Sequence, residues 1–197
     1  MRKYWLMLLV LVLVVAGVVG WYMLTHGRDH TVYYHPPART KTSGCVIVHA
    51  LPDSACTPGA VDTSATWERL CTRSTREVRR TKESIVRAVF ASYGVSREDG
   101  VPRENDHVIS LELGGAENDP ANFFPQAYED EAKLEAGLLS DDELGAHAKD
   151  KVENWLHARV CRRELVLADA QRMIATDWVA VYHEYVARHG QRPSRRR

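Results

Sequence analysis

The chain has 197 residues, of which 45% are hydrophobic and 26% charged, and 26 Lys and Arg balance 26 Asp and Glu to a formal net charge of zero. This composition excludes a disordered protein, and the length fits one ordinary domain with an appendage. The zero net charge excludes bulk attraction to a polyanion, so any affinity for nucleic acid must come from local patches. Basic residues crowd positions 69–87 and fill positions 195–197, although a solvated face and a tail explain them equally well.

The first 24 residues predict a membrane anchor. After Arg2 and Lys3, residues 4–24 carry no charge, and about 20 apolar residues in a helix match the thickness of bilayer hydrocarbon. Aromatic residues near both ends suit the membrane interfaces: Tyr4, Trp5, Trp21 and Tyr22. A cleaved signal peptide is the alternative, but its apolar core usually has about 7–15 residues before an Ala-x-Ala pattern. Positive charge before the span favours a single-pass protein of the cytoplasmic membrane, with its C-terminal domain periplasmic or extracellular.

Residues 25–43 predict a linker, because they are polar, include Pro36-Pro37 and cannot bury enough apolar surface to fold. The globular domain is expected over residues 44–190, and residues 191–197 form a basic tail. Four cysteines without Cys-x-x-Cys spacing favour disulfides in an oxidising compartment over a zinc site: Cys45, Cys56, Cys71 and Cys161. Three pairings are possible, of which Cys56 with Cys71 is locally plausible, and buried free thiols are the alternative.

Two stretches predict strands. Residues 45–49 (CVIVH) form a short apolar run followed by turn formers. Residues 107–113 (HVISLEL) alternate in character, which predicts one buried and one wet face, and Gly114-Gly115 then forms a turn.

Three stretches predict helices. Apolar residues recur at helical spacing over residues 81–93, and Gly94 is a reasonable stop. Two further apolar stripes, over residues 144–160 and 174–185, predict amphipathic helices that close the domain. The expected fold class is therefore α+β.

The most informative run is residues 105–126 (NDHVISLELGGAENDPANFFPQ), which places Asp-His before a strand, then Gly-Gly, then an Asn in a turn-rich loop. An Asp-His pair alone is a weak signal, because most such residues are structural. Together, Asp106 to Gly115 resemble the HNH or ββα-metal nucleases, especially secreted bacterial members with the motif Asp-His-hydrophobic-x-x-Leu-Glu-Leu-Gly-Gly. The likeness continues through Asp119 to Pro125 and Ala146 to Asn154, and it spans roughly residues 52–186.

The resemblance implies a ββα-metal core with additional C-terminal helices, and it implies roles for three residues. His107 resembles the general base, and an unperturbed imidazole pKa near 6.5 suits proton transfer at neutral pH. Asp106 resembles a metal ligand. Asn122 resembles the residue that fixes the loop through backbone hydrogen bonds, although an ordinary turn Asn would occupy nearly the same position.

The resemblance also implies one divalent metal ion, for which Mg or Mn suit the ligand types and Zn or Ni are possible. His147 is the natural candidate for the last ligand, and Asp150 or Asn154, on the same helical face, could supply a second. The acidic stretch between Pro125 and Gly145 would repel DNA if it faced the groove, so we interpret it as an outward loop or a short helix.

The expected function is metal-assisted hydrolysis of phosphodiester bonds in DNA, with RNA as a second substrate, by a tethered endonuclease. Candidate phosphate contacts are Arg79, Arg80 and Arg103, which would bind without sequence specificity. The alternative is a catalytically inactive, membrane-tethered binding or structural module on the same fold. A metalloprotease has little support, because no His-Glu-x-x-His helix is present. The sequence leaves open the natural substrate and whether an inhibitor protein accompanies the chain.

Overall fold

The computed structural model describes residues 12–18, 32–75, 79–96 and 100–190. The chain divides into two units, Met1–His30 and Thr31–Arg197. In the first unit residues 12–18 are helical, and among the described residues no helix is both long and apolar enough to span a membrane. The remainder of the predicted anchor and the basic tail at 191–197 lie outside the described residues.

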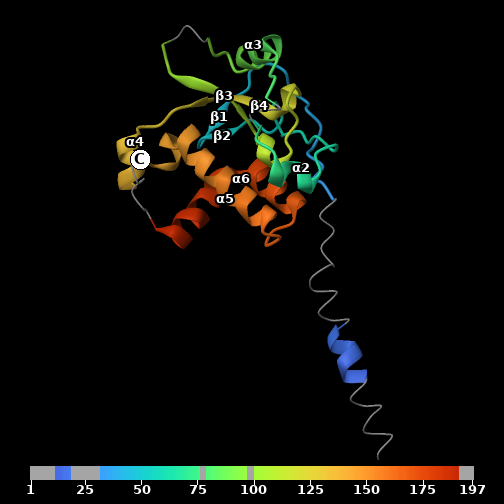
Figure 1. The fold of residues 1–197 in the computed structure, drawn as a ribbon. Coiled ribbons are helices and arrows are strands. Elements are labelled where there is room, and N and C mark those ends of the chain that lie inside the picture. Colours follow the sequence, from blue (N-terminus) through green and yellow to red (C-terminus); the bar gives the residue numbers. More distant parts are fainter. Residues whose placement is uncertain (1–11, 19–31, 76–78, 97–99, 191–197) are drawn as a thin grey trace, which may run out of the picture. The chain divides into compact units, whose positions relative to one another are not determined.

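The second unit is a mixed α+β domain, as the sequence predicts, with two small antiparallel sheets (Figure 1). Labelled as in Figure 1, its elements in chain order are β1 (Ile47–Val48), β2 (Leu51–Pro52), α2 (Trp67–Thr72), α3 (Glu83–Ser92), β3 (Arg103–His107), η2 (Leu111–Leu113), η3 (Pro120–Asn122), β4 (Phe123–Ala127), α4 (Glu131–Ala136), η4 (Asp141–Glu143), α5 (Ala146–Cys161) and α6 (Leu167–His189).

Strands β3 and β4 pair antiparallel, with His107 opposite Phe123 and Asp106 opposite Phe124. The prediction of a strand over residues 107–113 is therefore wrong: the strand ends at His107, and the 3-10 turn η2 follows. Val108 and Ile109 are consecutive and both buried, so the alternating pattern does not mark one face of a strand. The real strand escaped notice because its residues, RENDH, are polar.

The core lies mainly between α5 and α6, which pack side by side (Figure 1). Both predicted apolar stripes are confirmed, since their residues are buried or partly buried: Leu144, Ala148, Val152, Trp155, Leu156 and Val160, then Ile174, Trp178, Val181, Tyr182 and Tyr185. Helix α6 kinks at Asp177, whose backbone is non-helical (φ −161°, ψ 82°). The Asp177 carboxylate accepts a hydrogen bond from Ala180 N at 2.8 Å, which restarts the helix as an N-cap does.

Three smaller predictions have mixed outcomes. Helix α3 confirms the helix predicted over residues 81–93, and Gly94 follows it with φ +65°. The predicted strand at 45–49 shrinks to the two residues of β1, whose side chains are exposed. The acidic stretch after Pro125 contains the short helices α4 and η4, in agreement with its interpretation.

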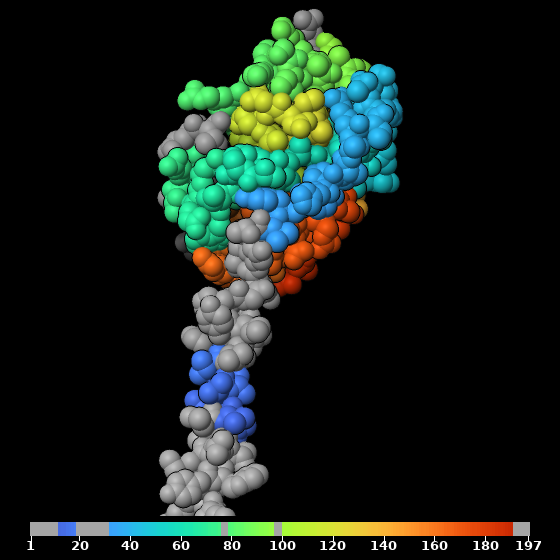
Figure 2. All heavy atoms as spheres, turned by 90° about the vertical axis from the view of Figure 1, so that its right-hand side faces the viewer, coloured from blue at the N-terminus to red at the C-terminus, as the bar shows by residue number. Residues whose placement is uncertain are grey.

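Residues 32–43 belong to the domain, so the predicted linker is wrong for this part. Figure 2 shows this segment, in light blue, lying along the surface of the domain. Tyr34 N donates to Gln171 Oε1 at 2.9 Å, and the Tyr33 hydroxyl donates to Ala65 O at 2.8 Å. Both aromatic rings pack against the core. Two tyrosines and their long-range hydrogen bonds therefore attach this segment to the domain, although its average composition is polar.

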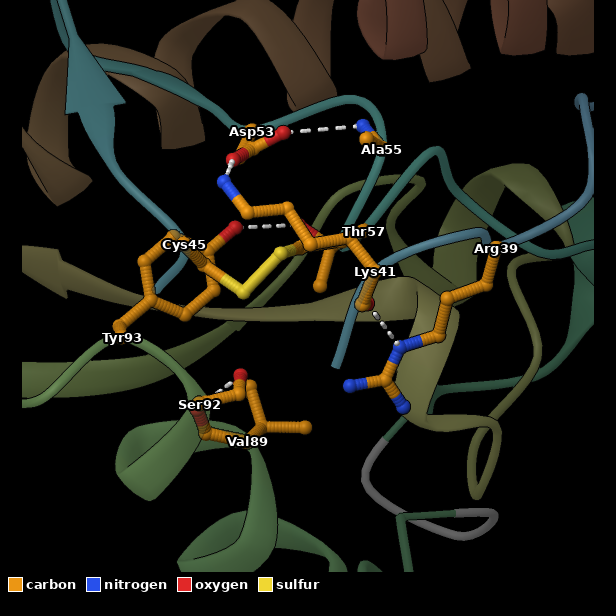
Figure 3. The surroundings of a disulfide bond; sticks show 10 residues. Arg39, Lys41, Cys45, Asp53, Ala55, Thr57, Val89, Ser92 and Tyr93 are labelled. Atoms are coloured by element: carbon orange, nitrogen blue, oxygen red, sulfur yellow. Dashed lines mark hydrogen bonds and ion pairs between the residues drawn. A yellow bond between two sulfur atoms is a disulfide. The ribbon is translucent and has the colours of Figure 1, made fainter. Parts of the chain in front are cut away.

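All four cysteines form disulfides, Cys45–Cys56 and Cys71–Cys161, and the pairing of Cys56 with Cys71 does not occur. Figure 3 shows the Cys45–Cys56 disulfide next to the ion pair of Lys41 and Asp53 (2.8 Å). This ion pair joins the segment of residues 32–43 to the chain that follows β2. The second bond joins α2 to the end of α5, across 90 residues of sequence. Contact between these helices decides the pairing, and sequence proximity does not predict it.

Candidate active site

A cleft of about 430 Å³ opens at the end of β3, between that strand, the η2 turn and α5. Five of the residues proposed from the sequence line it and so share one site: Asp106, His107, Asp150, Asn154 and Arg79. The other described residues that line it are Thr75, Glu104, Asn105, Ser110, Leu111, Glu112 and Glu153. Five carboxylates therefore face one opening.

His107 is the best-defined group in the cleft. It is 6% exposed, packs against the Phe123 ring (centroids 4.4 Å apart), and finds no hydrogen-bond partner for its Nε2 among the described residues. Burial, followed by the positive charges of Lys149 and Arg79, lowers its pKa to about 3, while a hydrogen bond with the Glu117 backbone acts in the opposite direction. At neutral pH this imidazole is uncharged, so its unpaired ring nitrogen can accept a proton, although burial makes it a weaker base than the unperturbed imidazole expected from the sequence.

Asp106 is held by a buried lysine. Its Oδ1 accepts from His107 N at 2.7 Å, and its Oδ2 lies 2.8 Å from Lys149 Nζ. Lys149 is 1% exposed, also pairs with Glu153, and donates to His107 O at 2.7 Å. Burial alone would lower the pKa of Lys149, but Asp106 and Glu153 more than compensate and raise it. Lys149 therefore stays charged and ties α5 to the end of β3.

The remaining carboxylates are crowded and partly buried, which disfavours their charged forms. Burial, followed by the charge of Asp106, raises the pKa of both Glu104 and Asp150, and burial is also the main cause of the raised pKa of Glu112. Among the described residues, Lys149 and Arg79 bring two positive charges to five carboxylates. A divalent cation bound among these oxygens would reduce the repulsion, and carboxylate oxygens are the ligands that Mg²⁺ and Mn²⁺ prefer.

Asn122 fastens the loop that follows His107. It is fully buried; its Oδ1 accepts from Ile109 N (2.9 Å) and Ala60 N (3.2 Å), and its Nδ2 donates to Ile109 O (3.0 Å) and Ala116 O (3.1 Å). These are backbone hydrogen bonds of the kind that the resemblance implies. Asn122 does not line the cleft, so its effect on His107 is through the loop.

Gly115 allows this loop to close, because a Cβ built there would lie 1.8 Å from Ile109 O and 2.8 Å from Asn122 Nδ2. We expect Gly115→Ala to lower the free energy of unfolding by about 2–3 kcal/mol, since backbone must shift to admit the methyl group. Gly94→Ala is the matched control: its methyl group would meet no described atom within 4 Å, and only its positive φ costs about 1 kcal/mol. Urea unfolding compares the two, and equal losses would contradict the role of Gly115.

His147 lies apart from the cleft. Its ring nitrogens approach Glu129 Oε2 (3.4 Å) and Glu131 Oε1 (3.5 Å), and its ring is 5.2 Å from that of Tyr128. The Glu129 carboxylate accepts from the backbone N of His147 and Ala148, which neutralises the first turn of α5. The structure thus brings Asp106 and Asp150 into one cleft but does not gather His147 with them.

The three arginines proposed as phosphate contacts are not equivalent. Arg79 lines the cleft, while Arg80 and Arg103 do not. Arg80 N donates to Glu117 Oε1 at 2.8 Å, so its main chain supports the loop beyond His107. Arg103 begins β3, opposite Ala127.

Sequence reasoning missed Lys149 and three carboxylates: Glu104, Glu112 and Glu153. Lys149 and Glu153 stand four residues apart on α5, the spacing of an ion pair within one helix. That spacing could have identified the pair, but not its burial against Asp106, which lies 43 residues away in the sequence.

The low pKa of His107 predicts an acid-sensitive fold. Between pH 6.5 and about 3 the unfolded chain binds a proton at His107 that the folded chain excludes, so this residue lowers the free energy of unfolding as the pH falls. In EDTA, from pH 7.5 to 5, we expect the wild type to lose about 2 kcal/mol more than His107→Gln, which cannot titrate. Parallel losses in urea titrations of the two proteins would show that His107 is not buried in this way.

Comparison of the chain with protein-family models, with curated proteins and with solved structures finds no match. The case for a function therefore stands on the motif residues and on the geometry of the cleft.

Proposed function

We propose that the chain is a metal-dependent endonuclease of the HNH type, which hydrolyses phosphodiester bonds of DNA, and of RNA as a second substrate. The observation that carries the proposal is the unpaired Nε2 of a neutral, buried His107 in a cleft lined by five carboxylates. The order β3, β4, α5 around this cleft supports a ββα core.

In this proposal His107 is the general base. Hydrolysis of a phosphodiester requires a water molecule to lose a proton as it approaches phosphorus. His107 Nε2 is the acceptor, and the Glu117 backbone and the Phe123 ring hold the imidazole in place. The Asn122 loop fixes the backbone directly after it.

Asp106 and Asp150 are the residues that we propose hold the divalent ion, and Glu104 is near enough to feel the charge of both. Each carboxylate oxygen has more than one lone pair, so Asp106 can bind a metal while it keeps its hydrogen bonds to Lys149 and His107. When bound, the ion supplies Lewis-acid stabilisation of charge on the phosphoryl group and the leaving oxygen.

Arg79 is the proposed phosphate contact within the cleft. Because the five carboxylates would repel a polyanion, binding of nucleic acid should depend on the metal as well as on this guanidinium. The bound metal thus serves for affinity as well as for the reaction. The position of the enzyme outside the cytoplasmic membrane remains a prediction from residues 1–24.

The test is degradation of plasmid DNA by the purified full chain with Mg²⁺, Mn²⁺, Ni²⁺ or Zn²⁺, or with EDTA. We expect cleavage with at least one cation and none with EDTA. In the same buffers, a cation that binds in the cleft should raise the thermal unfolding temperature of the wild type, because it binds only the folded state. Asp106→Asn should reduce that rise.

The rival proposal, an inactive binding or structural module, predicts a different result. A folded protein that shows neither cleavage nor a metal-dependent shift of its unfolding temperature would overturn the nuclease and favour that module. Both DNA and RNA should be tested, since cleavage of RNA alone would support metal-dependent phosphodiester hydrolysis but change the proposed substrate.

A further inference from the structure

A second cluster of metal-ligating side chains lies where α2 meets the end of α5. Cys71 belongs to α2, while His157 and Cys161 stand one turn apart on α5. All three are half-buried, and one ligand atom from each lies within 4.8 Å of the others. The two sulfur atoms are joined as a disulfide, so neither is a thiolate, which is the form that binds metals.

The histidine lies in position for a third ligand. His157 Nε2 lies 3.3 Å from Cys161 Sγ. Around a tetrahedral zinc ion, with Zn–S near 2.3 Å and Zn–N near 2.0–2.1 Å, a sulfur and a nitrogen ligand lie roughly 3.5 Å apart. Helix α5 therefore already presents this nitrogen and sulfur at about the required separation, and only the sulfur of Cys71 must move away from its partner.

The other ring nitrogen of His157 also has a suitable neighbour. Nδ1 is 3.5 Å from Glu112 Oε2, and Nε2 is 3.0 Å from Leu70 O. With its proton on Nε2, the ring donates to Leu70 O; with its proton on Nδ1, it donates to Glu112 and frees Nε2 for a metal. A carboxylate behind a ligating histidine is the usual outer partner of zinc sites.

We propose that reduction of the Cys71–Cys161 disulfide creates a zinc-type metal site made of Cys71, His157 and Cys161, with Glu112 as its outer partner. A dithiol reductant supplies two electrons and two protons and becomes a disulfide, while the S–S bond of the protein becomes two thiols. Metal binding then displaces one proton from each thiol. Water completes the four ligands.

This site is independent of the proposed nuclease activity, because none of its three ligands lines the cleft. Glu112 is the point of contact, since it lines the cleft and faces His157. The redox state of the two cysteines therefore selects between a covalent bond and a metal as the connection between α2 and α5.

The experiment uses the full chain, reduced with dithiothreitol, freed of reductant without oxygen and titrated with Co²⁺ as a spectroscopic probe. We expect one equivalent to produce thiolate-to-cobalt charge-transfer absorption with the intense d–d bands of a tetrahedral ion. Zn²⁺ should displace it, and the oxidised protein should show neither band. A reduced chain without these bands, whether folded or unfolded, would overturn the proposal.

Variants identify the ligands. We expect Cys71→Ser with Cys161→Ser to abolish the charge-transfer band, His157→Ala to shift the d–d bands, and Glu112→Gln to weaken Zn²⁺ binding by about 10–100-fold. The matched control is Cys45→Ser with Cys56→Ser, which removes the other disulfide and should leave the spectrum unchanged. Loss of the band in this control, or an unchanged spectrum in His157→Ala, would show that metal binds elsewhere.

Discussion

His107→Ala is expected to lower the rate of metal-dependent DNA cleavage by about 10²–10⁴-fold, the usual contribution of a general base. The reason is geometric as well as chemical. His107 lines the cleft, and its Nε2 is a buried acceptor without a partner among the described residues. The other described residues there are carboxylates, an arginine, neutral polar side chains and Leu111. The measurement is the initial rate of plasmid nicking at saturating metal, with the wild type and the variant at equal concentration.

His183→Ala is the matched control for this experiment. His183 lies on α6, is exposed and pairs with Asp141 at 2.8 Å, and it does not line the cleft. We expect its rate to equal that of the wild type. If both variants lose activity equally, or if His107→Ala keeps it while folded, His107 is not the base.

Lys149→Met is expected to have the largest effect on stability, a loss of about 3–5 kcal/mol in the free energy of unfolding. Lys149 Nζ makes three buried contacts, with Asp106, Glu153 and the His107 carbonyl. Removing the ammonium leaves two carboxylates close together in a buried site without a counter-charge, and breaking such a pair from one side typically costs this much. Urea unfolding at pH 7.5 in EDTA measures the loss.

Two further variants separate the charge of Lys149 from its packing. Lys151→Met changes the same residue type two positions later on α5, away from the cleft, and should cost less than about 1 kcal/mol. Adding Glu153→Gln to Lys149→Met removes one of the two unpaired carboxylates, so it should recover part of the loss. If the double variant is no more stable than the single one, the repulsion between the carboxylates is not the cause.

Local periodicity and the adjacency of residues in the sequence are enough to predict two helices and the Asp106-His107 pair. The stripes of α5 and α6 follow from apolar spacing, because a helix buries the same face every three to four residues. Asp106 and His107 were found because they are neighbours in a recognisable run. The polar strand β3 was missed, since its pairing with β4 stabilises it and its own residue preferences do not.

Contacts between groups that are distant in the sequence depend on how the elements pack. Lys149 reaches Asp106 because α5 packs against the end of β3, and the same packing turns Asp150 and Glu153 toward the cleft while His147 contacts Glu129. The pairing of Cys71 with Cys161 depends on the contact between α2 and α5. Such contacts join residues far apart in the chain, so no local pattern of residues encodes them. Burial, which also depends on the packing of distant elements, is the largest cause of the low pKa of His107.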